Sequence, residues 1–349
     1  MQLYYSAFLL EYKHHFGVSS NIRTHTQSVF IKLVFKQFVG YGEACLPAYL
    51  GETLQLTTQF FKKAKPILQN YNLANCNLNL ALIQTILMQV DSLDANCNAA
   101  KAAIDIALHD LIATITNQPV YKLLGITKPP PCQTSFTIGI DDVKLLPIKI
   151  NQAAEFKILK IKAGTKNDKA LINLIRTYTN KPLYVDVNQG WTDKYFVLEM
   201  LHWLKQQNVI LVEQPMPIAM IDEMAWVNAQ SPLPIIADES VKRLADIEKI
   251  KHAYSGINIK LMKSTGLHEA YKMITLAKQL NLKIFLGCMA ESACATSAMA
   301  QLMYFADYVD LDAPNLLTNN PFTGVTYLNG NISINTQNGI GVTYTGPNF

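Results

Sequence analysis

Charge is sparse in this sequence, and it is not concentrated in any one segment. Only 16% of the 349 residues are charged, and 30 Lys and Arg against 26 Asp and Glu give a formal net charge of +4. The lysines are scattered, whereas a nucleic-acid-binding domain normally carries a basic stripe or patch. The sequence therefore argues against a nucleic-acid partner. Half of the residues are apolar and no segment is low in complexity, which favours a folded chain over disorder.

Export and membrane signals are also missing. The residues at the start, Met1–Tyr5, include no basic region and no long apolar core, so no signal peptide is predicted. The stretch from Ser292 to Val309 is rich in Ala and Met, but Ser, Thr, Gln and Asp interrupt it. Such a stretch is typical of a buried helix and not of a membrane span. We expect a cytoplasmic protein with no membrane partner.

Cysteine patterns that bind zinc or form disulfide frameworks are absent. The six cysteines show neither Cys-x-x-Cys spacing nor pairing with His, and the seven histidines are scattered. Free thiols in a reducing compartment account for such a pattern. We predict no zinc site.

What the chain does contain is a repeat of eight short apolar stretches, each ending in a polar or chemically useful residue. The final residues follow one another at intervals of 22 to 28 residues: Thr137, Lys162, Asp186, Glu213, Asp238, Lys260, Cys288 and Asp310. A parallel strand with its crossover helix and two loops needs about that length. The repeat predicts an α/β barrel, whose functional site lies at the C-terminal ends of the strands.

The two ends of the chain do not follow this repeat. Residues 1–130 mix strand-like and helical patterns, and Pro129–Pro131 forms a linker that suits neither a helix interior nor a central strand. The tail 315–349 is rich in turns and lacks a good eighth helix. We therefore predict a (β/α)7β-type modified TIM barrel at 131–314. An α+β capping domain of residues 1–130, completed by 315–349, would cover its mouth.

Three carboxylates end three successive predicted strands: Asp186, Glu213 and Asp238. Neighbouring barrel strands lie roughly 5 Å apart, so these side chains must converge. Like charges at that spacing repel unless a cation lies between them, and oxygen ligands favour a hard ion. We predict one Mg²⁺ per subunit. The alternative, that each carboxylate is an ordinary helix cap, requires a coincidence on three strands in a row.

Lysines flank these carboxylates in the predicted barrel. Lys160 and Lys162 are two apart on one strand and share a face, and Lys260 ends a strand on the other side. An inward lysine is costly unless it is paired or functional. Nearby ammonium groups and a bound divalent cation would lower the pKa of such lysines, as a catalytic base requires. The alternative is that they only neutralise the carboxylates.

Together these segments resemble the muconate-lactonising branch of the enolase superfamily. The resemblance is carried by Lys160-Ile-Lys162, Asp186-Val-Asn-Gln-Gly-Trp191, Val212-Glu-Gln-Pro215, Ala237-Asp-Glu-Ser240 and Asn258-Ile-Lys260-Leu-Met-Lys263. Enolase-superfamily sites combine a Lys or His base with Mg²⁺ that stabilises an ene-diolate. The resemblance implies proton abstraction by Lys162 with help from Lys160, and by Lys260 on the opposite face. It also implies that Asn188, Gln214 and Glu239 orient the metal ligands.

Within that branch, Asp310-Leu-Asp312 resembles the Asp-x-Asp signature of the dipeptide epimerases. The resemblance implies a homo-oligomeric enzyme of murein peptide recycling. It would invert the α-carbon of the C-terminal residue of L-Ala-L-Glu and L-Ala-D-Glu by two-base 1,1-proton transfer. Asp310 and Asp312 would hold the α-ammonium group. The other residues implied to contact the dipeptide are Thr137, Lys160, Cys288, Met289, and Arg23 on a capping-domain loop, His14–Arg23.

Three alternatives remain open at this point. The same site could epimerise dipeptides with an apolar or cationic second residue. It could also serve an N-acylamino acid racemase, an o-succinylbenzoate synthase or a muconate cycloisomerase, although their substrates lack the free α-ammonium that Asp310 and Asp312 suit. A non-catalytic metabolite-binding barrel is the third alternative, and Lys162 and Lys260 argue against it.

Overall fold

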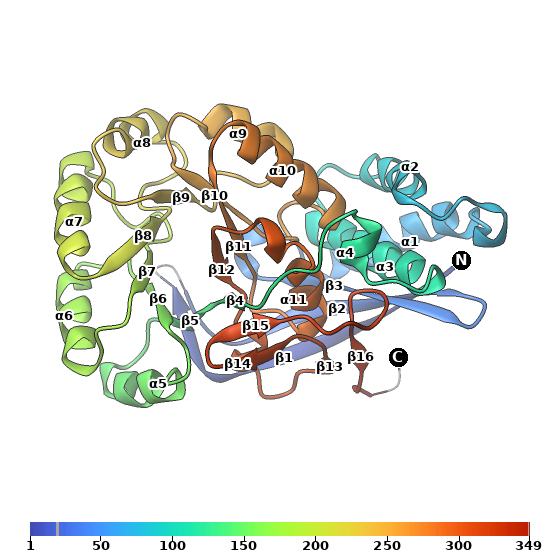
Figure 1. The fold of residues 1–349 in the computed structure, drawn as a ribbon, viewed down its shortest axis with the longest axis horizontal. Coiled ribbons are helices and arrows are strands. Elements are labelled where there is room, and N and C mark those ends of the chain that lie inside the picture. The colour runs from blue at the N-terminus through green and yellow to red at the C-terminus, as the bar shows by residue number, and fades with distance from the viewer. Residues whose placement is uncertain (19–20, 348) are drawn as a thin grey trace.

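Eight parallel strands form the barrel that the repeat predicts. The structure is a computed structural model, and it describes residues 1–18, 21–347 and 349. The strands follow one another in sequence order around a single sheet, and each pairs in parallel with the next (Figure 1). They are β5 (Ser135–Ile138), β6 (Ile158–Lys162), β7 (Leu183–Asp186), β8 (Val209–Glu213), β9 (Ile235–Ala237), β10 (Gly256–Ile259), β11 (Lys283–Gly287) and β12 (Tyr308–Asp310).

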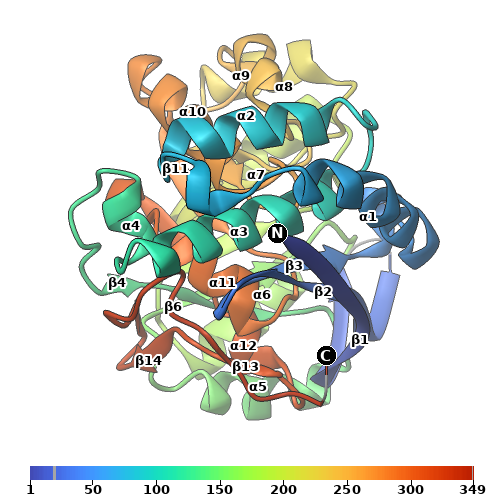
Figure 2. The same ribbon diagram turned by 90° about the vertical axis from the view of Figure 1, so that its right-hand side faces the viewer.

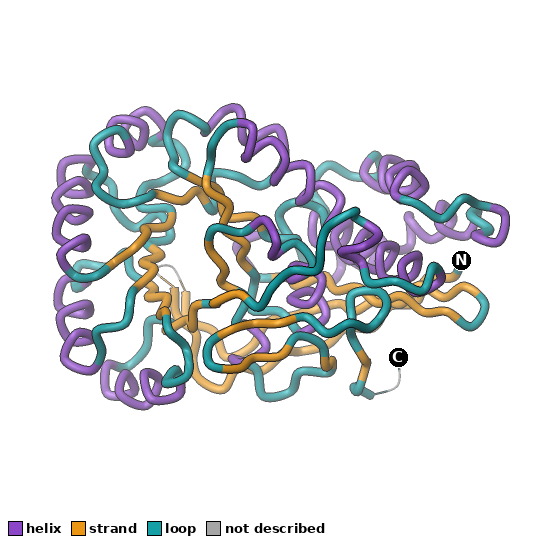
Figure 3. Tube along the Cα trace, viewed as in Figure 1, coloured by secondary structure: helices purple, strands orange, loops and turns teal. Residues whose placement is uncertain are grey.

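Helices connect these strands and surround them, as Figure 3 shows. The connecting helices are α5 (Leu146–Gln152), α6 (Asp168–Tyr178), α7 (Lys194–Gln206), α8 (Ile221–Asn228), α9 (Leu244–Ile250), α10 (Leu267–Gln279) and α11 (Ala293–Ala300). After β12 there follows a single short helix, α12 (Ala313–Leu316), where an eighth barrel helix would otherwise begin. The predicted (β/α)7β arrangement is therefore confirmed.

Side chains join the first strand of the barrel to the last. Ser135 Oγ donates to Asp310 Oδ1 at 2.6 Å, and the backbone N–H of Thr137 donates to Asp312 Oδ2 at 2.5 Å. The N–H of Leu311 donates to Thr134 Oγ1 at 2.8 Å. The two acids of the Asp-x-Asp segment thus lie at the seam where the barrel closes.

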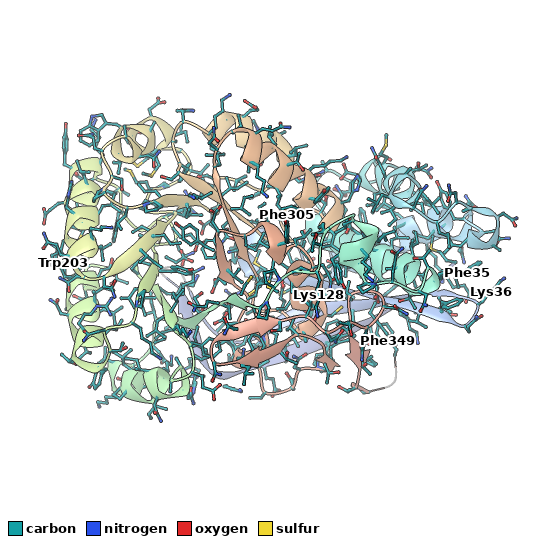
Figure 4. The ribbon with its side chains drawn as sticks, in the orientation of Figure 1. Phe35, Lys36, Lys128, Trp203, Phe305 and Phe349 are labelled. Carbon is teal, nitrogen blue, oxygen red and sulfur yellow. The ribbon has the colours of Figure 1, made fainter. Side chains whose placement is uncertain are left out.

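The N-terminal segment forms a three-stranded antiparallel sheet packed against helices (Figure 2). The strands are β1 (Gln2–Val18), β2 (Asn21–Phe35) and β3 (Phe38–Leu46); the helices are α1 (Leu54–Gln69), α2 (Leu80–Asp91), α3 (Asn98–Ile115) and α4 (Val120–Leu123). In Figure 4, Phe35 and Lys36 at the turn between β2 and β3 lie at the opposite end of the molecule from Trp203 on α7.

The C-terminal tail returns to this N-terminal segment. Its strands are β13 (Phe322–Thr323), β14 (Thr326–Leu328), β15 (Asn331–Ser333) and β16 (Thr343–Tyr344), and β15 also pairs with β4 (Cys132–Gln133). The N–H of Thr318 donates to Glu11 O at 2.9 Å, and the N–H of Ile340 donates to Asp110 Oδ1 at 2.8 Å. The domain boundaries at 130 and 314 remain a prediction. In the described residues, no helix combines the length and hydropathy needed to cross a membrane.

Two buried carboxylates of the N-terminal segment cap helices of the barrel. Asp105 on α3 accepts the N–H groups of Leu267 (2.6 Å) and His268 (3.1 Å) at the start of α10. Glu43 on β3 accepts the N–H groups of Ser292 (3.0 Å) and Ala295 (3.2 Å) at the start of α11. The first N–H groups of a helix have no partner within it, so these acids satisfy donors that would otherwise be buried alone.

We expect Asp105→Ala to lower the free energy of unfolding by about 2 kcal/mol, because two buried N–H groups lose their acceptor. Urea unfolding followed by circular dichroism measures this. The control is Glu248→Ala on α9, which removes only an ion pair to Lys251 between side chains that are 54% and 45% exposed. It should change stability by less than about 0.5 kcal/mol. Equal stability of the two variants would contradict the capping role.

Candidate active site

A cavity of about 280 Å³ opens at the carboxyl ends of the barrel strands. Its walls include twelve of the residues predicted from the sequence: Arg23, Thr137, Lys160, Lys162, Asn188, Asp238, Glu239, Lys260, Cys288, Met289, Asp310 and Asp312. Residues from the barrel and from the N-terminal segment therefore share one cavity, which we call the mouth cavity.

Three carboxylates converge at the strand ends next to the mouth cavity, and Asp238 among them lines it. Asp186 and Glu213 end the neighbouring strands β7 and β8 in register, and Asp238 follows β9 directly. One oxygen of each lies within 4.8 Å of the other two, and all three side chains are buried. An all-oxygen set of three carboxylates fits a hard divalent cation such as Mg²⁺, which usually keeps open positions for water or substrate.

Gln214 and Asn188 fix these carboxylates from the adjoining turns. Gln214 Oε1 accepts the N–H groups of Asp238 (3.0 Å) and Ser240 (3.1 Å). The N–H of Asn188 donates to Asp186 Oδ1 at 3.1 Å, and its Nδ2 donates to Glu239 Oε1 at 3.2 Å. Both residues have positive φ, 37° for Gln214 and 46° for Asn188. Such backbone strain persists only where surrounding contacts hold it, and it is common near functional sites.

Lysines flank the carboxylates on two sides. Lys162 Nζ lies 2.5 Å from Asp186 Oδ2, and Lys260 Nζ lies 2.6 Å from Asp238 Oδ2. Lys160 Nζ lies 2.7 Å from Glu213 Oε2. Because β7, β8 and β9 separate β6 from β10 in the sheet, Lys162 and Lys260 approach the carboxylates from opposite sides.

The carboxylates dominate the proton affinity of Lys160 and Lys260. Burial alone would lower the pKa of Lys160 and of Lys260, but the facing carboxylates outweigh it and raise both pKa values well above the ordinary range. Lys160 does lower the pKa of Lys260, as predicted, but by less than Asp238 raises it. The predicted effect of a neighbouring ammonium group is present but is outweighed by the carboxylates, and the predicted lowering of the pKa by a bound divalent cation stays a prediction. The charges also act on Glu213: burial and the charge of Asp186 raise its pKa to about 7.

The two acids of the Asp-x-Asp segment lie in different electrostatic surroundings. Asp310 Oδ2 lies 2.8 Å from Lys160 Nζ, and this ammonium overcomes burial and lowers the pKa of Asp310. Burial and the charge of Asp310 raise the pKa of Asp312 to about 7. Both carboxylates line the mouth cavity beside Thr137. They form an acidic wall at the barrel seam that suits a cationic group.

Cys288 and Met289, which follow β11, line the cavity next to this wall. Cys288 Sγ donates to Asp310 O at 3.2 Å. Burial raises the pKa of the Cys288 thiol well above its usual value, so it is a neutral side chain and not a thiolate nucleophile. Tyr49 OH, from the 3₁₀ turn Ala48–Leu50, donates to Met289 Sδ at 2.6 Å. The N-terminal segment thus touches the barrel at this wall.

Arg23 reaches the mouth cavity from a hairpin and not from a loop. The segment predicted as a loop, His14–Arg23, lies in strands β1 and β2 except for residues 19 and 20, which are outside the described residues. Arg23 pairs in register with Phe16. Its side chain is half-buried, and Arg23 Nε has no hydrogen-bond partner in the described part of the chain. A guanidinium donor is therefore available at the cavity.

Sequence reasoning gave no role to Lys263 or to the Asn258 side chain, which complete the polar floor. Lys263 Nζ donates to both Asp238 Oδ1 and Asp238 O, and to Asn258 O at 3.0 Å. Asn258 Nδ2 donates to Glu213 Oε1 at 2.7 Å. The sequence feature that could have indicated a role for Lys263 is its three-residue spacing from Lys260. A tight turn after β10 brings both ammonium groups to Asp238.

Comparison with known proteins assigns this architecture to a family. Residues 11–125 match the N-terminal domain of mandelate racemase / muconate lactonizing enzyme, and residues 149–347 match the enolase C-terminal domain-like family. The chain therefore belongs to the mandelate racemase / muconate lactonizing enzyme family of the enolase superfamily.

Particular relatives are dipeptide epimerases. An L-Ala-D/L-Glu epimerase from Bacteroides thetaiotaomicron is 44% identical over 343 residues, which cover 98% of this chain and 88% of the relative. The structure of a substrate-liganded complex of the L-Ala-D/L-Glu epimerase from Bacillus subtilis superposes with a TM-score of 0.90 at 25% identity over 99% of both chains. A dipeptide epimerase from Cytophaga hutchinsonii, complexed with Mg and D-Ala-L-Val, gives a TM-score of 0.88 at 26% identity over 99% of this chain and 95% of the other.

Proposed function

We propose that this protein is a Mg²⁺-dependent dipeptide epimerase that interconverts L-Ala-L-Glu and L-Ala-D-Glu. The observation that carries the proposal is the placement of Lys162 and Lys260 on opposite sides of one carboxylate cluster. Inversion of a carbon requires a base on each face, and this arrangement supplies both. The similarity to an L-Ala-D/L-Glu epimerase over 98% of the chain supports the choice of substrate.

Asp186, Glu213 and Asp238 would hold the Mg²⁺. Removal of the α-proton next to a carboxylate leaves a second negative charge on that group, and bound Mg²⁺ supplies Lewis-acid stabilisation of it. Asn188, which also binds Glu239, keeps Asp186 in place, and Gln214 holds the backbone at Asp238. Glu213 is held by Asn258.

Lys162 and Lys260 move the protons. Lys162 takes the α-proton from one face of the substrate, and Lys260 returns a proton to the other; in the reverse direction they exchange roles. Lys160 contributes positive charge beside the reacting carboxylate and assists Lys162, because three carboxylates keep it protonated.

The acidic wall sets the orientation of the substrate. Asp310 and Asp312 receive the α-ammonium group, while Thr137, Cys288 and Met289 border the N-terminal alanine. N-acylated amino acids, succinylbenzoate precursors and muconate carry no ammonium to neutralise two buried carboxylates, so the wall disfavours them. The homo-oligomer implied by the resemblance remains a prediction.

Solvent-deuterium exchange tests the proposal. The enzyme is incubated with Mg²⁺ and L-Ala-L-Glu in D₂O, and proton NMR follows the Glu α-proton and the appearance of L-Ala-D-Glu. Loss of the α-proton together with formation of the D-epimer is expected. A cycloisomerase, a synthase or a metabolite-binding barrel would give neither change with this dipeptide, and that result would overturn the proposal.

Arg23 provides the specificity prediction. Its guanidinium should pair with the side-chain carboxylate of the C-terminal Glu, because Arg23 lines the cavity and its Nε has no hydrogen-bond partner among the described residues. Arg23→Ala should cost on the order of 2–4 kcal/mol in kcat/KM for L-Ala-L-Glu. The loss for L-Ala-L-Leu should be much smaller.

The competing idea is that the cavity accepts apolar or basic side chains and Arg23 faces solvent. Steady-state kinetics of the wild-type protein and of Arg23→Ala, each on L-Ala-L-Glu and on L-Ala-L-Leu, distinguishes the two ideas. Equal losses on the two substrates, or a wild-type preference for Ala-Leu or Ala-Lys, would favour the competitor.

A further inference from the structure

The backbone pairing of strands β9 and β10 ends before it reaches the active site. Their ladder stops at the last residue of β9, so Asp238 and Lys260 both lie beyond it. Across the carboxylate cluster, by contrast, the ladder of β7 and β8 includes Asp186 and Glu213 themselves. Although β9 and β10 are neighbours (Figure 1), no backbone pair among the described residues fixes the distance between Asp238 and Lys260.

The side chain of Lys263 makes the missing contact between the two strand ends. Lys263 is 3% exposed, and its Nζ donates to two backbone carbonyls, Asp238 O at 2.6 Å and Asn258 O at 3.0 Å. It also donates to Asp238 Oδ1. The N–H of Lys263 donates to Lys260 O at 2.9 Å, and this turn brings the side chain back to the strand ends. One ammonium group therefore joins β9 to β10 where their ladder has ended.

Hydrogen bonding distinguishes Lys263 from its neighbour Lys260. An ammonium group has three N–H donors, and those of Lys263 are matched by Asp238 O, Asp238 Oδ1 and Asn258 O. Lys263 lines the mouth cavity, but it has no donor left for a substrate. Lys260 Nζ donates to a single acceptor among the described residues, Asp238 Oδ2 at 2.6 Å. Lys260 is therefore free to act on a substrate, whereas Lys263 is committed to the protein.

Asn258 extends this contact to a second carboxylate of the cluster. Its backbone oxygen accepts from Lys263, and its Nδ2 donates to Glu213 Oε1 at 2.7 Å. The amide is packed closely against β11, because a Cβ at Gly287 would lie only 2.4 Å from Asn258 Oδ1. The end of β10 is thus fixed on the side of β8 and β11, and Lys263 fixes it to the end of β9.

We propose that Lys263 is a positioning residue of the reaction. It clamps the end of β9 to the end of β10 and so sets the distance between the carboxylate of Asp238 and the base Lys260. The clamp matters to catalysis only if Lys260 is a base, so the inference rests on the proposed function. Lys162 contacts Asp186 from β6, on the far side of the cluster. Loss of the clamp should therefore impair proton transfer on the Lys260 face more than on the Lys162 face.

Exchange of the substrate α-proton in D₂O, at saturating Mg²⁺, tests this asymmetry in two backgrounds. In Lys162→Ala the exchange of one epimer proceeds through Lys260, and in Lys260→Ala the exchange of the other proceeds through Lys162. Lys263→Met, which keeps a long side chain and removes the donors, is added to each. It should slow exchange by about 10-fold or more in the Lys162→Ala background and by less than about threefold in the other. Lys272→Met, at an exposed position on α10, is the matched control and should slow neither.

Amide hydrogen exchange of the metal-free protein tests the clamp without substrate. Peptides that cover the ends of β9 and β10, residues 236–242 and 257–264, should exchange faster in Lys263→Met than in the wild type. Peptides that cover the ends of β7 and β8, residues 184–190 and 211–217, should be unchanged. Lys263→Gln, whose shorter amide cannot reach all three acceptors, should give the same pattern and serves if Lys263→Met does not fold.

Equal slowing of α-proton exchange in the two backgrounds would overturn the positioning role. Unchanged amide exchange at the ends of β9 and β10 would overturn the clamp itself. A wild-type protein that neither exchanges nor inverts the dipeptide would instead overturn the proposed function, and the amide exchange of the metal-free protein keeps the two failures distinguishable.

Discussion

Replacing Lys162 or Lys260 by alanine will stop the interconversion of the two epimers. The two lysines approach the carboxylate cluster from β6 and from the end of β10, with three strands between them. A transfer that inverts the carbon needs one lysine to remove the proton and the other to return one. Loss of either interrupts both directions, and we expect a fall in epimerisation of about 10³-fold or more.

Each variant should nevertheless keep proton exchange on one face of the substrate. The surviving lysine can still remove and return the α-proton of the epimer that faces it, so that epimer should exchange its α-proton in D₂O without inverting. Proton NMR on the separate L,L and L,D dipeptides measures this. The control is Lys169→Ala on α6, an exposed lysine paired with Glu199, which should behave as the wild type. Interconversion at the normal rate in either active-site variant would refute the two-base scheme.

Loss of the divalent cation is expected to have a comparable effect. Three buried carboxylates with oxygens within 4.8 Å of one another need positive charge, and the substrate gains another negative charge as its proton leaves. Excess chelator should therefore reduce turnover to background, and added Mg²⁺ should restore it. Asp238→Asn should abolish turnover even in saturating Mg²⁺, because it removes one ligand charge and leaves the shape of the side chain.

Folding must be shown to survive in that variant, since Asp238 also pairs with Lys260 and Lys263. Near-ultraviolet circular dichroism and the Tm provide this check. Glu213→Gln, which retains an amide oxygen for Asn258 to donate to, serves as a second ligand variant. Asp222→Asn, at an exposed position in the first turn of α8, is the matched control and should be fully active. Full activity of the wild-type protein in excess chelator would show that no metal is needed.

Much of the floor of the site was predictable because barrel topology determines where strand ends meet. Once Asp186, Glu213 and Asp238 were placed at the ends of successive parallel strands, their convergence followed without knowledge of any contact. The direction of the lysine pKa shifts was not predictable in the same way. For Lys160 and Lys260 it depends on distances of 2.6 to 2.8 Å between particular atoms, and at that range opposite charges outweigh ammonium neighbours farther away.

The sequence pattern also could not predict which distant segments of the chain contact each other. Strand β1 pairs with β2 over a long hairpin, whereas Arg23 was placed in a loop from the resemblance to the dipeptide epimerases and not from the local pattern of residues. The acceptors for the α10 and α11 N-termini lie 162 and 249 residues away in the chain. No local motif marks Asp105 or Glu43 as a cap for a distant helix.

The capping of α10 by Asp105 and of α11 by Glu43 also affects the design of fragments and chimaeras of this enzyme. A barrel fragment expressed alone would begin two of its helices with unfulfilled donors, so the barrel is not an autonomous module even though its strands close a sheet. The N–H groups at the start of α10 and α11 gain these carboxylate acceptors only where the N-terminal segment is docked. Exchange of N-terminal segments between relatives, as a way to transplant substrate preference, must therefore preserve an acid at both positions.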